Sequence, residues 1–135
     1  MGPAIQNLEH LLNVPTGCGE QVMAMITPNL YVLRYLKSSG RLTKSLYQRA
    51  IRNMKIGYQR ILDYAHADGS FSAFGYHDPS GSMFLTAFVV RTLKQVKEYI
   101  HVDENVIRKA INWITKNQLE NGCFHAGHHV FHELV

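Results

Sequence analysis

The sequence has little of what would define several common classes of protein. Only two of its 135 residues are cysteine, Cys18 and Cys123, which are too few to staple a fold and leave either two free thiols or one bridge. Charged residues make up 18% and hydrophobic residues 46%, which excludes a disordered chain and allows one domain with an ample core. No apolar run reaches the length of a membrane-spanning helix, so we expect no membrane span in this segment.

The charge of the chain is modest. The formal net charge is +4, and we interpret the charged residues as scattered along the sequence rather than clustered. Nucleic-acid binding proteins usually carry a concentrated basic patch, and we therefore predict no nucleic-acid partner.

What the sequence does contain is helical periodicity. Apolar residues recur at helical spacing in four segments, and no pair of strands is convincing. The first helix follows Gly19 and ends near Gly40, with Pro28 expected to bend or restart it. The second follows Thr43 and runs to the stop at Asp68-Gly69. Six aromatic residues fall on helical faces or turns, and we expect most of them to pack in the core. They are Tyr31, Tyr35, Tyr58, Phe71, Phe74 and Phe88.

The other two helices complete a repeated pattern. Ser82 is the expected cap of the third helix and Asp103 of the fourth, which should end near Asn121-Gly122. Asp68-Gly69-Ser70-Phe71 is echoed about fifty residues later by Asn121-Gly122-Cys123-Phe124. Each turn follows a long helix, as in stacked helical hairpins, which cannot bury both faces alone. The sequence thus predicts an all-α fold that is part of a larger ring or solenoid.

The stretch Thr16-Gly17-Cys18-Gly19-Glu20-Gln21 (TGCGEQ) is the candidate chemical centre. Glycines on either side of Cys18 permit a tight turn at the start of a helix, where thiolate is favoured. Gln21 lies three residues on, so its carboxamide and the thiol share one side of that helix. Attack of the thiolate on the carboxamide, with loss of ammonia, would form an internal thioester. The alternative for an arbitrary C-x-x-Q is a helix start with a buried, inert cysteine.

The motif resembles that of a known family. Residues 17–21 match the GCGEQ thioester core of the alpha-2-macroglobulin and complement family, and Met23 also matches, although Val22 stands where Asn is usual. The similarity continues through residues 28–33, 57–60, 68–71, 85–89 and 121–122, so it covers nearly the whole chain; Met83-Phe84 departs from it. Met1-Gly2-Pro3 is similar to family sequence just before the motif, which makes Met1 an expected internal residue of a longer protein.

The resemblance implies a fold and a role. Residues 1–135 would be the N-terminal part of a single thioester domain, a partial alpha/alpha toroid built from helical hairpins. The family implies a secreted protein of innate immunity or protease trapping, complement-like, acting as an opsonin or an endopeptidase inhibitor. Such a protein is extracellular, or lipid-anchored to the cell surface in its parent form. Cys18 and Gln21 would form the bond, with Gly17, Gly19 and Glu20 supporting the motif.

The chemistry implied is a single-use acyl transfer, so we do not expect an enzyme in the ordinary sense. No cofactor is expected, because the reactive group is the internal Cys18–Gln21 cross-link. The expected partners are hydroxyls of a target surface or an attacking protease, together with the remaining domains of the parent protein. Cys123 resembles a family cysteine whose partner would lie beyond Val135.

Four histidines crowd the end of the chain: His125, His128, His129 and His132. They are open to three interpretations: a polar loop, a metal site using the i, i+4 pair His128 and His132, or an acyl-transfer group. The resemblance maps the last role to His132, within the candidate region 125–133, as the imidazole that takes the acyl group and directs it to hydroxyls. Two alternatives to covalent attachment therefore stay open, a non-covalent protein-binding helical module and, less favoured, a His-rich metal-binding domain.

Overall fold

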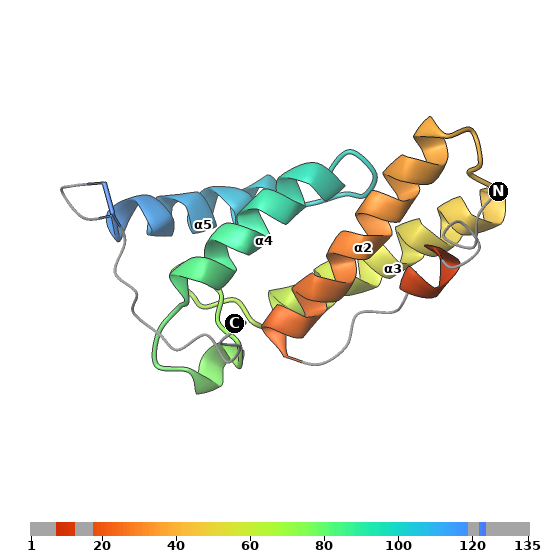
Figure 1. Cartoon of the computed structure of the whole chain (residues 1–135). Coiled ribbons are helices and arrows are strands. Elements are labelled where there is room, and N and C mark those ends of the chain that lie inside the picture. Colours follow the sequence, from red (N-terminus) through yellow and green to blue (C-terminus); the bar gives the residue numbers. More distant parts are fainter. Residues whose placement is uncertain (1–7, 13–17, 119–121, 124–135) are drawn as a thin grey trace.

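The fold is all-α, as predicted (Figure 1). A computed structural model describes residues 8–12, 18–118 and 122–123. Within them lie four α-helices and two short 3-10 helices: η1 (Leu8–Leu11), α2 (Gly19–Ser38), α3 (Lys44–Leu62), η2 (Gly75–His77), α4 (Met83–Val96) and α5 (Glu104–Lys116). An isolated antiparallel bridge joins Ala65 and Phe71.

Three of the helix starts are set by the side chains that the sequence predicted. Thr43 accepts a hydrogen bond from the backbone N–H of Leu46 at 3.1 Å, which caps α3. Ser82 caps α4 and Asp103 caps α5 in the same manner. Each such cap satisfies a backbone donor that the helix leaves open and contributes about 1 kcal/mol.

Pro28 does not restart the first helix, because α2 runs unbroken from Gly19 to Ser38. Proline removes the hydrogen bond to the carbonyl four residues back, but tertiary burial outweighs that loss here. The neighbouring side chain of Asn29 donates to the Met25 carbonyl at 2.9 Å, which adds a bond beside the missing one.

Two helices end earlier than the periodicity predicts. α3 ends at Leu62, where Asp63 to Ala65 form turns that lead into the bridge with Phe71. α5 ends at Lys116 rather than near Gly122. The amide of Asn117 donates to the Trp113 carbonyl at 2.8 Å and competes with continued helix at that point.

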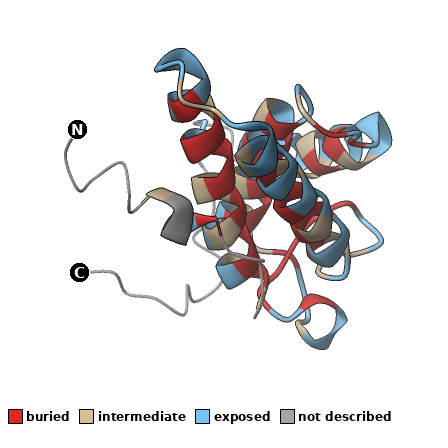
Figure 2. Ribbon diagram, turned by 90° about the vertical axis from the view of Figure 1, so that its right-hand side faces the viewer, coloured by how far each residue is buried: buried red, intermediate tan, exposed pale blue. Residues whose placement is uncertain are grey.

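The four helices form two hairpins joined through α2. α2 packs against α3, α4 and η1, and α4 packs against α5. The buried residues, coloured red in Figure 2, lie where these helices face one another. A buried polar contact also joins the first hairpin: the Asn53 amide donates to the Asn29 carbonyl oxygen at 3.1 Å. Two stacked hairpins agree with the predicted repeat, and closure into a toroid stays a prediction.

The glycines of the two repeated Asp/Asn-Gly pairs share a positive φ. Gly69 has φ of 93° and Gly122 has φ of 83°, values that side-chain-bearing residues rarely adopt. The repeated sequence therefore places glycine where the backbone requires it.

Half of the aromatic residues expected in the core lie elsewhere. Tyr58 and Phe71 are buried and Phe88 is half-buried, but Tyr31, Tyr35 and Phe74 are 50%, 49% and 44% exposed. Tyr31 and Tyr35 are four residues apart and share one face of α2, which no other described element covers. Helical spacing shows that residues share a face, but not whether that face has a neighbour.

Candidate functional site

Cys18 and Gln21 meet at the first turn of α2. Cys18 is the residue that caps the helix, with extended backbone angles of φ −72° and ψ 172°, and Gln21 is the third helical residue. The carboxamide oxygen of Gln21 accepts a hydrogen bond from the backbone N–H of Cys18 at 3.1 Å. The Cys18 side chain in turn faces the backbone N–H of Gln21, which completes a capping box. The thiol and the amide carbon that it would attack are thus held in one turn.

The pair lies at the N-terminus of α2, where the positive end of the helix dipole is located. Cys18 is half-buried whereas Gln21 is exposed. Glu20 lies in the same first turn and is half-buried, where its carboxylate also stabilises the helix start.

Gly19 is required by close packing. It is buried, and a Cβ atom there would lie 3.1 Å from Leu85 Cδ2, 3.1 Å from the Ser72 carbonyl oxygen and 3.3 Å from Tyr64 Cγ. Its backbone φ is not positive, so conformational freedom, the reason given by the sequence argument, does not apply at this position. Gly17 lies outside the described residues.

A loop that the sequence argument did not assign to the site holds this turn in place. The N–H of Gly19 donates to the Ala73 carbonyl at 3.0 Å, so residues 70–75 close over the start of α2. Ser72 is buried and its hydroxyl contacts His66 Nε2 at 2.6 Å and donates to the Gly75 carbonyl at 3.1 Å. The sequence signals for this segment were the repeated Asp68-Gly69-Ser70-Phe71 turn and the family similarity at residues 68–71.

The loop is in turn anchored to the second hairpin. The backbone N–H of Phe71 donates to the Thr86 hydroxyl on α4 at 2.9 Å, and Phe71 itself is buried. Gly69 lies against Lys109 of α5, where a Cβ would approach its backbone to 2.7 Å. The site thus depends on both hairpins.

Asp68 shapes the turn that leads into this loop. Its carboxylate accepts hydrogen bonds from the Ser70 N–H at 2.9 Å and from the Ser70 hydroxyl at 2.6 Å. Burial raises the pKa of the Asp68 carboxyl, but the two bonds from Ser70, with the charge of His66 and a bond from Trp113, lower it overall. Asp68 is therefore an ionised structural residue at neutral pH.

The remaining predicted residues are not placed beside Cys18. His132, the other three C-terminal histidines and the rest of region 125–133 lie outside the described residues, so their roles stay predictions. Cys123 is exposed and is not bridged to Cys18, which removes the one-bridge alternative. In the described ranges no three His, Cys, Asp or Glu residues gather as a metal site would require.

Comparison with known protein families agrees with the motif and the fold. The family model for the A-macroglobulin TED domain matches residues 1–135, the whole chain. The chain therefore belongs to the A-macroglobulin thioester-domain family. Domains of this family are typically extracellular. None of the helices in the described ranges is long and apolar enough to cross a membrane.

Proposed function

We propose that the protein forms an internal thioester between Cys18 and Gln21 and uses it once to attach itself covalently to a target. The observation that carries the proposal is the contact between the two residues in the first turn of α2, where the Cys18 N–H lies 3.1 Å from the Gln21 carboxamide oxygen. Membership of the thioester-domain family supports the same chemistry.

The geometry suggests how the bond would form. The Cys18 thiolate attacks the side-chain carbonyl carbon of Gln21, and the Cys18 N–H is placed to stabilise the negative charge that develops on its oxygen. The S–C bond forms, the C–N bond breaks, and the nitrogen leaves as ammonia after taking up a proton. Docking of residues 70–75 onto Gly19 limits the access of water on one side of the helix start.

Transfer to the target would use the predicted histidine. His132 attacks the thioester carbonyl, which releases the Cys18 thiolate and leaves the acyl group on the imidazole. A target hydroxyl then displaces the imidazole and gives up its proton to the thiolate, which leaves an ester between Gln21 and the target. Without this step, amines would be the acceptors. The reaction has one turnover, and the proposed setting is a secreted protein of innate immunity or protease trapping.

The test is the intact mass of the freshly purified full-length protein before and after methylamine, with peptide mapping around Cys18 and Cys18→Ser as the matched control. We expect the Cys18–Gln21 peptide to be lighter by one ammonia. Methylamine should then add to Gln21 and free one thiol, with no reaction in Cys18→Ser. Full mass and a reactive thiol in rapidly handled protein would contradict the proposal.

The role of His132 has its own readout in the same protein. His132→Asn should leave the mass deficit intact but shift transfer from glycerol, a hydroxyl acceptor, toward methylamine. An unchanged ratio of ester to amide product would remove His132 from the mechanism while leaving the thioester in place.

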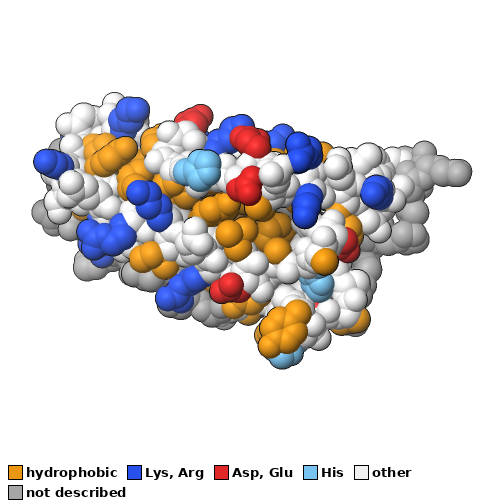
Figure 3. Space-filling view, turned by 180° about the vertical axis from the view of Figure 1, so that it is seen from behind, with side chains coloured by type: hydrophobic (Ala, Val, Ile, Leu, Met, Phe, Trp, Pro, Cys, Tyr) orange, Lys and Arg blue, Asp and Glu red, His pale blue; other side chains and the backbone are white. Residues whose placement is uncertain are grey.

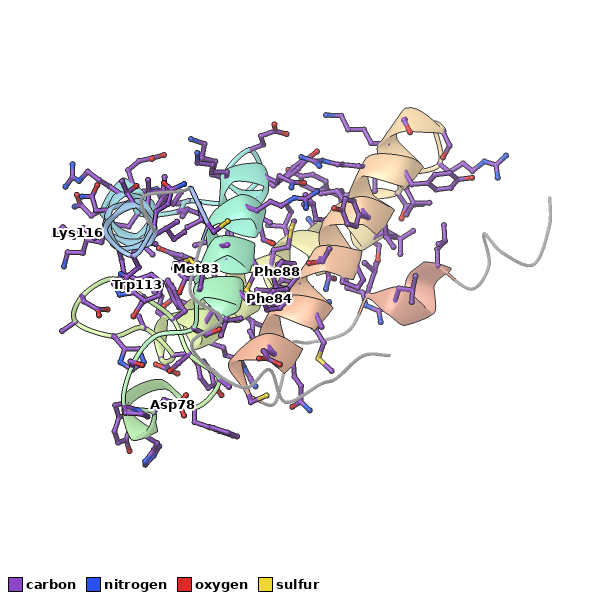
Figure 4. All side chains as sticks on the ribbon, turned by 60° about the vertical axis from the view of Figure 1, so that its left-hand side comes forward. Asp78, Met83, Phe84, Phe88, Trp113 and Lys116 are labelled. Carbon is purple, nitrogen blue, oxygen red and sulfur yellow. The ribbon has the colours of Figure 1, made fainter. Side chains whose placement is uncertain are left out.

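A second candidate, non-covalent protein binding, is favoured by an apolar groove between α4 and α5. Met83, Phe84 and Phe88 lie along the first turns of α4 (Figure 4) and line a groove of about 310 Å³ together with Ala87, Arg91 and Ile114. Phe84 is 58% exposed, so the groove presents apolar surface that a partner could cover. Binding of a partner by Cys18→Ser protein would support this candidate.

A further inference from the structure

The positive charge of the chain is concentrated on its first hairpin, contrary to the even distribution inferred from the sequence. Residues 21–62 contain eight of the fourteen Lys and Arg residues and none of the ten Asp and Glu residues, which gives this segment a formal charge of +8. The rest of the chain has six cations and ten anions, so its formal charge is −4. Lys and Arg side chains (blue) spread over the left part of Figure 3, where α2 and α3 lie.

The exposed side of α3 carries most of this charge. Five of its residues are cations, and all five are exposed: Lys44, Arg49, Arg52, Lys55 and Arg60. Their spacing places them on the side of the helix opposite to its buried residues, which include Ala50, Met54 and Ile61. At a rise of about 1.5 Å per residue, the charged face is about 24 Å long. We call these five residues the α3 basic face.

No acidic group neutralises this face in the part of the chain that the structure describes. The two ion pairs found there are Arg34–Glu98 and Lys97–Glu104, and neither involves α3. Arg49, Arg52 and Lys55 follow one another at intervals of three residues, a spacing at which like charges on a helix repel. The helix therefore bears an unfavourable arrangement of charge that an anionic partner would relieve.

We propose that the α3 basic face binds an acidic polysaccharide, a linear polymer that carries sulfate or carboxylate groups. A band of cations about 24 Å long on one side of the helix complements a linear polyanion, and arginine forks bind sulfate and carboxylate with paired hydrogen bonds. Gln48 and Gln59 are exposed on the same side of α3 and add neutral hydrogen-bonding groups that suit sugar hydroxyls. The proposal does not depend on the thioester.

The other polyanions fit less well. A helix that binds a membrane surface carries large apolar residues beside its cations, whereas Tyr47 is the only exposed large apolar residue among those described on α3. A protein interface has an apolar centre depleted of charge, which this face lacks. Nucleic acid is disfavoured because domains of this family are typically extracellular.

The test uses heparin as the probe and the full chain as the protein. The variant is Arg49→Gln/Arg52→Gln/Lys55→Gln, and the matched control is Lys94→Gln/Arg108→Gln/Lys116→Gln, which removes the same charge from exposed positions on α4 and α5. Affinity is measured by calorimetry at several salt concentrations, with neutral dextran, duplex DNA and phosphatidylserine vesicles as comparison ligands.

We expect heparin to bind at physiological salt, and the α3 variant to lose at least tenfold in affinity. The slope of log K against log salt should fall by about 2 to 3, because fewer counterions are released. The control should lose less than threefold. Equal losses in the two variants would overturn the proposal, since net charge alone would then explain binding. Tighter binding of DNA or of vesicles than of heparin, lost in the same variant, would overturn it in favour of that ligand.

Discussion

A single added methyl group at position 19 would disturb the candidate site. Gly19→Ala places a Cβ 3.1 Å from both Leu85 Cδ2 and the Ser72 carbonyl oxygen, closer than ordinary van der Waals contact. We expect the free energy of unfolding to fall by about 1 to 2 kcal/mol, as overpacked positions usually show. Urea denaturation measures the change.

Leu85 supplies the control for this prediction. Because Leu85 Cδ2 is one of the three closest atoms, Leu85→Ala should cost less in the Gly19→Ala background than in the natural protein. Strictly additive losses, or a Gly19→Ala protein as stable as the parent, would show that the space beside Gly19 is not limiting.

At the scale of elements, the first hairpin depends on a buried polar pair. Asn29 and Asn53 are 0% and 3% exposed, and the Asn53 amide donates to the Asn29 carbonyl oxygen. Asn53→Ala leaves that oxygen without this donor in a buried position, so we expect a loss of about 1 to 3 kcal/mol in the free energy of unfolding. The exposed Asn105→Ala serves as control and should change stability by less than about 0.5 kcal/mol. A loss no larger than that of the control would mean that the pair is not a determinant of packing between α2 and α3.

Helix starts were predictable from the sequence because they depend on local chemistry. Thr43, Ser82 and Asp103 each cap a helix through their own side chains, within two or three residues of the cap. The adjacency of Cys18 and Gln21 was predictable for the same reason, since both lie in one helical turn. Local chemistry is thus enough to predict where a helix starts and to predict a motif that is confined to one helical turn.

The features that the sequence analysis predicted wrongly depend on contacts between segments far apart in the chain. The exposure of Tyr31 and Tyr35 depends on which element covers α2, and the packing role of Gly19 depends on Leu85 and Ser72. Pro28 was expected to bend or restart the helix, but α2 packs against three other elements and does not restart at Pro28. No periodicity within one helix reveals such neighbours.

At the scale of the whole molecule, the uneven charge predicts a response to salt. Repulsion along α3 should be screened at high ionic strength, whereas the two surface ion pairs that salt weakens contribute little. Two like-charge pairs at about 0.2 to 0.5 kcal/mol each imply a rise in the melting temperature of about 2 to 5 °C between about 20 mM and about 500 mM NaCl, because the Debye length falls about fivefold over that range. Calorimetry measures this rise.

The α3 variant tests the origin of this effect. Arg49→Gln/Arg52→Gln/Lys55→Gln should melt higher than the natural protein at low salt and respond less to added salt. A melting temperature that falls with salt in the natural protein would show that ion pairs outweigh the repulsion on α3.

The hydrogen bond from Gly19 to Ala73 joins the start of α2 to a loop far along the chain. Hydrolysis of the proposed thioester is irreversible, whereas opening of that loop is a reversible fluctuation. Each opening that lets water reach the thioester would therefore hydrolyse it permanently, whereas an opening that admits no water would leave the bond intact. The fraction of molecules that have regained the mass of one water then sums every such event since synthesis. This turn would therefore keep a history, so that an aged preparation carries a record of the openings of the loop that holds it.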